Sequence, residues 1–287
     1  MKNNLRGITS LLMAASLYGL YGIYSRMIGI EFGAFSQNWI RNLLVAIIAL
    51  VLLKTLKKRT IRLRAKDKKW IIGWILCGSW VTIFTFIAFN NLPIGTVYFL
   101  VYAAMIIGGF LSGRIFYKEK LTSLKIVSLI LAGSGLLIIY SLTIPKGSIV
   151  FAGLSLLGGF LTGLWNTLSK KFSNHYPTLQ LVLIDSVASA VVGLIGAILV
   201  QEKLSLPLLS KGLPWVLIYA LTQVATVGLI ITGFKNIEAQ KGSIILPIEI
   251  VFASVFAFLF FKEVPVASVA IGGLLIIAAA IIPNLEK

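Results

Sequence analysis

The chain has 287 residues, 58% of them hydrophobic, and a mean hydropathy of +0.97, which is more apolar surface than a soluble domain can bury. The net charge of +17 invites a nucleic-acid interpretation. However, the lysines and arginines gather in alternate loops, as they do in membrane proteins. Helices and closed barrels are the folds that satisfy the backbone in lipid. The apolar runs are far longer than barrel strands of about 10 residues, so we predict an all-α integral membrane protein.

Ten apolar stretches have about the 20 residues that a helix needs to cross a bilayer. The first is long enough to be a genuine span rather than a cleaved signal. In chain order, the predicted spans are residues 7–28, 34–54, 69–91, 94–116, 122–142, 149–169, 178–200, 213–234, 241–261 and 266–283.

The basic residues predict the orientation of these spans. With the N-terminus inside, 20 of the 26 lysines and arginines face the cytoplasm and 5 face outward, while Arg41 lies within a span. Cytoplasmic loops of membrane proteins carry such an excess. We therefore expect a multi-pass protein of the cell membrane with both termini in the cytoplasm. The basic loop 54–69 supplies most of the excess, and it should also attract anionic lipid headgroups.

The second half of the chain repeats the first. Residues 89–119 read FNNLPIGTVYFLVYAAMIIGGFLSGRIFYKE, and residues 234–263 read FKNIEAQKGSIILPIEIVFASVFAFLFFKE. GLYGIYSRM (19–27) likewise matches GLWNTLSKK (163–171), and the offset stays at 143 to 145 residues. We therefore divide the chain into five-helix repeats at 1–143 and 144–287. Because five is odd, the second repeat is inverted, and inverted repeats place a substrate site near the midplane at their interface.

Several short motifs carry a family resemblance over essentially the whole chain. They are the arginine in NWIRNLLVA (38–46), the Lys-Glu pairs at 118–119 and 262–263, and glycines 133, 135, 272 and 273 in the fifth and tenth spans. In these the chain resembles the drug/metabolite transporter superfamily, specifically its ten-helix EamA type. The resemblance implies alternating-access movement of small metabolites, often amino acids and often outward. Many relatives carry Glu-Pro in span nine, whereas this chain reads LPIEI (246–250).

Three ionisable side chains lie well inside predicted spans: Arg41, Asp185 and Glu249. Such residues cost roughly 2.5–3.5 kcal/mol on insertion scales and usually face a bundle interior or an aqueous cavity. Pro247 has no amide hydrogen to donate to the carbonyl of Ser243, so we expect a local irregularity beside Glu249. Glu249 is a candidate for binding a substrate amine, and Glu249 or Asp185 for carrying a coupling proton. The alternative is that these residues only pair between helices, with Asp185 as a candidate partner for Arg41.

Aromatic and amide side chains complete the candidate site. Aromatic walls with a few polar groups suit a small organic solute and can hold its cation by cation–π contact. The alternative is that tyrosines and tryptophans mark the membrane interfaces or fill the core, and Tyr18 and Tyr24 fit this alternative well. The candidate substrate-binding residues are Tyr21, Arg41, Tyr98, Tyr102, Trp165, Asn166, Gln223 and Glu249.

Other motifs predict structural roles. Gly109-x-x-x-Gly113 and Gly159-x-x-x-Gly163 allow close helix contact, which we assign to packing within the bundle rather than to a dimer face. The sequence is compatible with a monomer and with a homodimer. The two Lys-Glu pairs are interpreted as orientation and capping features.

These observations favour a secondary-active or facilitative transporter whose partner is a small-molecule substrate. No phosphate-binding loop of the G-x-x-x-x-G-K-[ST] type occurs, so gradients would supply any energy. We expect no cofactor, no metal site, no catalytic residue and no nucleic-acid partner. The alternatives are a membrane-embedded enzyme of the transferase type and a non-transporting scaffold. An enzyme needs converging catalytic groups, and the sole histidine, His175, falls in a predicted loop.

Overall fold

A computed structural model describes residues 2–28, 33–140, 144–202 and 206–284. Lys203 and Lys287, which were counted in predicting the orientation of the spans, lie outside the described residues. The helices are α1 (Lys2–Gly19), α2 (Tyr21–Ile28), α3 (Ala34–Thr55), α4 (Ala65–Phe89), α5 (Ile94–Tyr117), α6 (Ser123–Ile139), α7 (Ile149–Leu168), α8 (Thr178–Leu199), α9 (Leu206–Asn236), α10 (Ala239–Ile245), α11 (Glu249–Phe261) and α12 (Ala267–Ile281). Short 3₁₀ turns lie at Ser169–Lys171, Leu246–Ile248 and Ile282–Asn284.

The helices confirm the predicted all-α membrane fold. Within the described residues, nine helical stretches are long and apolar enough to span a bilayer. The fifth predicted span forms the shorter helix Ser123–Ile139, because Tyr140 turns to an extended conformation with φ −114° and ψ 126°. The eighth predicted span lies within the longer helix α9, whose apolar spanning stretch is Gly212–Asn236, so Pro214 lies inside α9.

Two spans are interrupted. The first divides into α1 and α2 at Leu20, and the ninth divides into α10 and α11 at the turn Leu246–Ile248. The second interruption is the irregularity that Pro247 predicts, since proline has no N–H to continue the helical hydrogen bonds. It makes Glu249 the first residue of α11.

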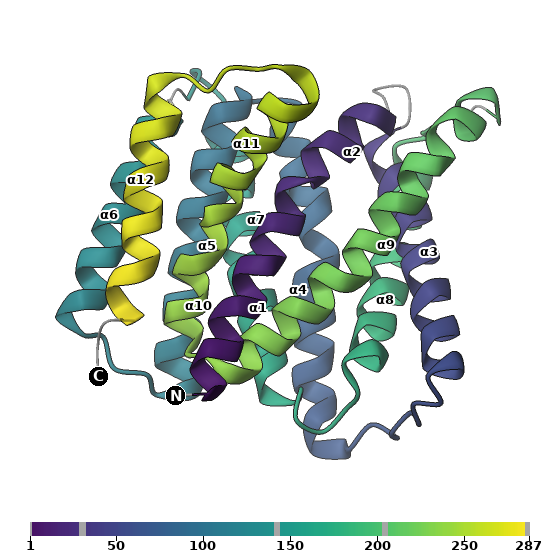
Figure 1. The fold of residues 1–287 in the computed structure, drawn as a ribbon. Helices are drawn as coiled ribbons and strands as arrows, with labels where there is room; N and C mark the ends of the chain where they lie inside the picture. The colour runs from purple at the N-terminus through teal and green to yellow at the C-terminus, as the bar shows by residue number, and fades with distance from the viewer. Residues whose placement is uncertain (1, 29–32, 141–143, 203–205, 285–287) are drawn as a thin grey trace.

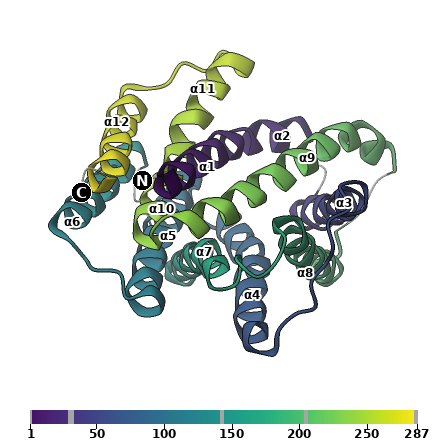
Figure 2. The ribbon, with the colours of Figure 1, turned by 60° about the horizontal axis from the view of Figure 1, so that its bottom comes forward.

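The helices pack between the two halves rather than within each half. The second spans α3 and α8 pack together at one edge of the bundle, and the fifth spans α6 and α12 pack together at the other (Figures 1 and 2). The pair α4–α7 has its counterpart in α9–α1, and the pair α5–α7 in α11–α1. If the two halves are exchanged, each of these helix pairs becomes another pair that is also in contact, as expected for inverted repeats. α1 begins and α12 ends on the same side of the bundle (Figure 1).

Large apolar side chains cover the outer faces of the helices. Leu199 on α8 is 76% exposed, and Leu274 on α12 is 67% exposed. Polar side chains such as Asn42 and Ser186 are instead buried. Because hydrocarbon tails solvate apolar side chains as well as a protein core does, this arrangement suits a bundle surrounded by lipid.

Glycines let α5 and α7 approach closely. A Cβ atom added at Gly159 would overlap the carbonyl oxygen of Val101, and one added at Gly163 would overlap that of Met105. Gly109 likewise faces the side chain of Ser243 on α10. These glycines pack inside the bundle, as predicted.

Gly163→Leu should therefore destabilise the protein more than Gly153→Leu on the same helix. Overpacking usually costs about 1–3 kcal/mol, and here the side chain would meet backbone rather than a flexible neighbour. A Cβ at Gly153 has no atom within 4 Å, so that variant is the matched control. Thermal unfolding of both purified proteins in detergent checks the prediction, and equal melting temperatures would contradict it.

Candidate functional site

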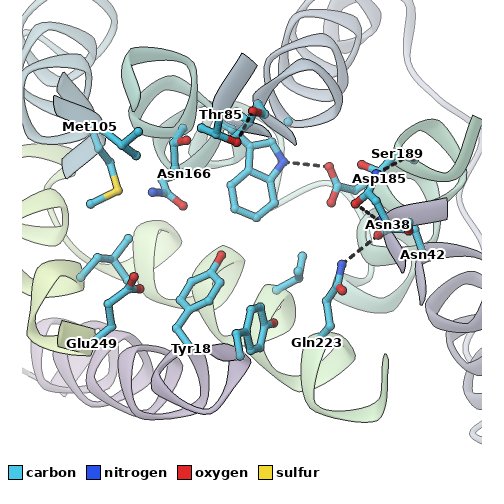
Figure 3. A pocket seen from close by; sticks show the side chains of 18 of the residues that line it. Tyr18, Asn38, Asn42, Thr85, Met105, Asn166, Asp185, Ser189, Gln223 and Glu249 are labelled. Atoms are coloured by element: carbon cyan, nitrogen blue, oxygen red, sulfur yellow. Dashed lines mark hydrogen bonds between the residues drawn. The ribbon is translucent and has the colours of Figure 1, made fainter. Parts of the chain in front are cut away.

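A cavity of about 300 Å³ lies between the two halves (Figure 3). This volume falls at the lower end of the range for small-molecule sites. Residues of both repeats line the cavity, including all nine candidates from the sequence: Tyr21, Arg41, Tyr98, Tyr102, Trp165, Asn166, Asp185, Gln223 and Glu249. The structure thus brings the candidates together, while their roles in binding or coupling stay predictions.

Each of the two acids that line the cavity meets an aromatic hydrogen-bond donor. The indole Nε1 of Trp165 donates to Oδ1 of Asp185 at 2.8 Å, and the hydroxyl of Tyr102 donates to Oε1 of Glu249. Glu249 lies at one end of the cavity and Asp185 at the other (Figure 3). Among the described residues, neither acid forms an ion pair. Carboxylates with a single donor each keep capacity to accept further hydrogen bonds.

Arg41 does not pair with Asp185. Its Nη2 donates to Oδ1 of Asn38 at 3.0 Å, and its Cζ lies 4.3 Å from the ring centroid of Tyr219. Its Nε is buried and has no hydrogen-bond partner within the part of the chain that the structure describes. The cation is therefore held by an amide and an aromatic face, which leaves it available to an anionic group.

Amide side chains extend the hydrogen-bonded network that begins at Arg41. Nε2 of Gln223 donates to Oδ1 of Asn42 at 2.8 Å, and Nδ2 of Asn42 donates to Oδ1 of Asn38 at 2.9 Å. Oε1 of Gln223 and Oδ1 of Asn166 are buried acceptors without a donor among the described residues. Leaving such groups unpaired costs about 1–3 kcal/mol each, so a ligand N–H placed there would be favoured.

Tyrosines form two walls of the cavity. Tyr98 and Tyr102 line the cavity, and Tyr140, which is not part of the lining, stacks on both; the ring centroids lie 5.7 to 6.4 Å apart. On the α1 side, Tyr21 lies 4.8 Å from Tyr18 and 4.5 Å from Tyr219, again between ring centroids. Tyr18, which we expected at the membrane interface or in the core, packs against the core and also lines the cavity.

The sequence analysis missed several other lining residues, among them Asn38, Asn42, Thr162 and Tyr219. Two signals could have found them. Asn38 and Asn42 flank Arg41 within the motif that first drew attention to it. The repeat offset supplies the second signal, because cavity residues occur in pairs 144 positions apart: Tyr18 and Thr162, Tyr21 and Trp165, Arg41 and Asp185, Tyr102 and Leu246, Met105 and Glu249.

Two ion pairs at repeat-equivalent positions lie toward opposite ends of the bundle. Nζ of Lys170 lies 3.2 Å from Oε1 of Glu119, and Nη1 of Arg26 lies 2.5 Å from Oε1 of Glu263. Each member of one pair is 144 residues from its counterpart in the other. Their environments differ: the Lys170 and Glu119 side chains are 23% and 6% exposed, whereas those of Arg26 and Glu263 are 57% and 51% exposed.

Glu119 also caps a helix of the other repeat. Its carboxylate accepts the backbone N–H groups of Ala239 at 2.7 Å and Gln240 at 2.9 Å, at the start of α10. A carboxylate is favourable there because helix N-termini carry partial positive charge. Lys118 and Lys262 end α5 and α11 in the left-handed conformation, with φ 55° and 59°. The Lys118-Glu119 pair thus has the predicted capping geometry.

Comparison with known proteins assigns the family. The model of the EamA-like transporter family matches residues 5–141 and again residues 149–285. The chain belongs to the EamA-like transporter family. Among curated proteins, no match is found. A solved structure described as "Crystal structure of protein" superposes with a TM-score of 0.82 at 15% identity, covering 100% of this chain and 99% of the other. At that identity it supports the fold alone.

Two matches of one family model in a single chain confirm the repeat that the sequence predicts. The EamA-like transporter is a multi-pass membrane protein of two five-helix units, and its cavity lies where these units meet.

Gly78→Val should close this cavity. A Cβ at Gly78 would overlap the indole of Trp165, and Oδ1 of Asp185 is 3.2 Å away, so the added side chain must displace Trp165 from its contact with Asp185. Gly73→Val is the matched control on α4, since nothing lies within 4 Å of a Cβ there. In a thermal-shift screen of amino acids, compounds that stabilise wild type and Gly73→Val should not stabilise Gly78→Val. Unchanged ligand shifts in Gly78→Val would contradict the assignment of the site.

Proposed function

We propose that this protein moves amino acids or similar small amphipathic solutes across the cell membrane by alternating access, in the outward direction. The observation that carries the proposal is the cavity between the repeats, in which a cation and two acids lie among aromatic walls. A substrate carboxylate would bind near Arg41, and a substrate amine near Glu249. The unpaired acceptors of Gln223 and Asn166 favour a ligand with N–H donors. Export is the direction that the family resemblance implies.

Alternating access is supported by the two unequal ion pairs. The pair Lys170–Glu119, with its cap on α10, joins the two halves on the side where α1 begins and α12 ends. The equivalent pair Arg26–Glu263 is exposed, and the residue before α5, Pro93, provides no side-chain cap. We infer a state that is closed on the side of Lys170–Glu119. The distribution of basic loops predicts that this is the cytoplasmic side. In the opposite state the roles exchange, and Glu263 caps the first turn of α5 from Gly95 onward.

Glu119→Gln should shift the protein toward that opposite state. A hydrogen bond to a charged group contributes about 1.5–3 kcal/mol, so amide exchange at 239–240 should accelerate by roughly 10- to 100-fold. The informative readout is the other end of the bundle, where exchange at residues 94–95, at the start of α5, should slow as Glu263 takes up its cap. Hydrogen–deuterium exchange with mass spectrometry measures both segments.

The matched control is Glu263→Gln, the repeat-equivalent change. It should leave residues 239–240 as protected as in wild type and should leave 94–95 in fast exchange. If exchange at 94–95 is the same in Glu119→Gln and in wild type, the two caps are not coupled.

Proton coupling, if it drives transport, would use Glu249. Its carboxylate lies in the cavity, beside the break in the ninth span, where access can alternate. Glu249→Gln should therefore abolish accumulation driven by a pH gradient but leave counterflow of radiolabelled amino acids in proteoliposomes. Asp67→Asn is the control, since Asp67 pairs with His175 and does not line the cavity.

The same assay tests the function itself. Counterflow that is lost in Gly78→Val and kept in Gly73→Val supports transport through this cavity. Accumulation driven by a pH gradient that survives in Glu249→Gln would remove Glu249 as the coupling acid and direct the test to Asp185→Asn. Proteoliposomes that exchange no amino acid or related solute would favour the enzyme or scaffold alternatives.

A further inference from the structure

A second, separate cleft of about 680 Å³ lies between α5 and α6 and opens on the outer face of the bundle. Its walls are apolar, and several of the side chains are exposed where lipid tails would surround them: Ile107 is 48% exposed, Leu111 43% and Leu121 50%. Phe110 and Leu129 line its inner side. At about 1.5 Å per helical residue, the wall from Ile107 to Arg114 extends roughly 10 Å along α5.

Two cations stand at one end of this cleft. Arg114 lies in the last turn of α5 and Lys120 in the connection to α6, and both side chains are exposed. Within the described part of the chain, neither side chain has an ion-pair or hydrogen-bond partner. The neighbouring Lys125 differs, because its ammonium is buried and bound to Glu238 and Gln240. The cleft thus combines a free positive end with a long apolar wall.

We propose that this cleft binds one anionic glycerophospholipid. The phosphate lies against Arg114 and Lys120, and an acyl chain follows Ile107, Leu111 and Leu129 toward the membrane interior. Charge complementarity selects this occupant: the two cations need an anion at headgroup depth, and the wall beyond them offers only apolar contact. A soluble phosphate would satisfy the cations but leave the apolar wall unmatched, and a zwitterionic lipid would bring its own cation against them.

The floor of the cleft links this lipid to the closed side of the transport cavity. Gln240 lines the cleft, is 1% exposed, and donates its backbone N–H to Glu119. Its side-chain oxygen also accepts a hydrogen bond from the ammonium of Lys125 at 2.9 Å. A lipid seated above Gln240 would therefore stabilise the segment that Glu119 caps. The binding itself does not depend on the proposed transport activity.

Native mass spectrometry of the full-length protein tests the site, with phosphatidylglycerol and phosphatidylcholine as probes. Wild type should retain one phosphatidylglycerol in preference to phosphatidylcholine. Arg114→Gln/Lys120→Gln should weaken that binding by roughly 30-fold, the loss expected for two cationic contacts to an anionic headgroup. Lys57→Gln/Lys58→Gln is the matched control, because it removes two exposed charges from the basic loop outside the cleft.

Two further measurements distinguish a seated lipid from a free phosphate and from general surface attraction. Excess glycerol 3-phosphate should not displace the bound lipid, since it lacks the acyl chains. Leu129→Trp, which fills the cleft without changing charge, should weaken retention in a variant whose melting temperature confirms folding. Equal losses in the two double variants would show general surface attraction and overturn the proposal. Equal retention of both lipids, or displacement by glycerol 3-phosphate, would overturn it as well.

Discussion

The cost of an unpaired charge in hydrocarbon governs the arrangement of this bundle. Arg41, Asp185 and Glu249 each meet an amide or aromatic partner rather than an opposite charge, and the three share one cavity. Insertion scales assign each such residue roughly 2.5–3.5 kcal/mol. A fold that merely needed stability would hold apolar residues at these positions. Their retention, with buried acceptors left unpaired, is understandable if a solute completes the polar contacts.

Because the second repeat is inverted, the two ends of the bundle are built from equivalent parts of the two repeats. Equivalent residues 144 positions apart meet around one cavity, so whatever one repeat does toward one side the other can do toward the opposite side. The positions have nevertheless diverged. At the offset of 144 residues, the position equivalent to Arg41 holds Asp185, and the position equivalent to Met105 holds Glu249. Duplication therefore accounts for where the cavity lies, whereas divergence accounts for its separated charges.

Much of the fold could be predicted because membrane helices are long, uniformly apolar and marked by basic loops. The repeat was visible because its offset is nearly constant. The errors were local. Tyr140 ends α6 early, and no composition signal marks a conformational change at a single residue in an apolar run. Tyr18 was expected at the interface or in the core because the sequence does not distinguish a tyrosine that only packs from one that also lines a cavity. The pairing of Arg41 with Asp185 failed because opposite charge alone cannot reveal that Asn38, Tyr219 and Trp165 supply nearer partners.

In the proposed mechanism, the capping carboxylate would allow one end of such a bundle to close without a large apolar gate. Glu119 accepts hydrogen bonds from two backbone N–H groups of the second repeat and from the ammonium of Lys170, and the two N–H groups would otherwise need water or another acceptor. Its counterpart Glu263 has the exposed partner Arg26. Since both carboxylates occupy the same place in their repeats, under the proposed alternating access the stabilisation lost at one end would be recovered at the other. Such an exchange of similar interactions would keep the two states close in free energy, as a transporter that opens to both sides of a membrane needs.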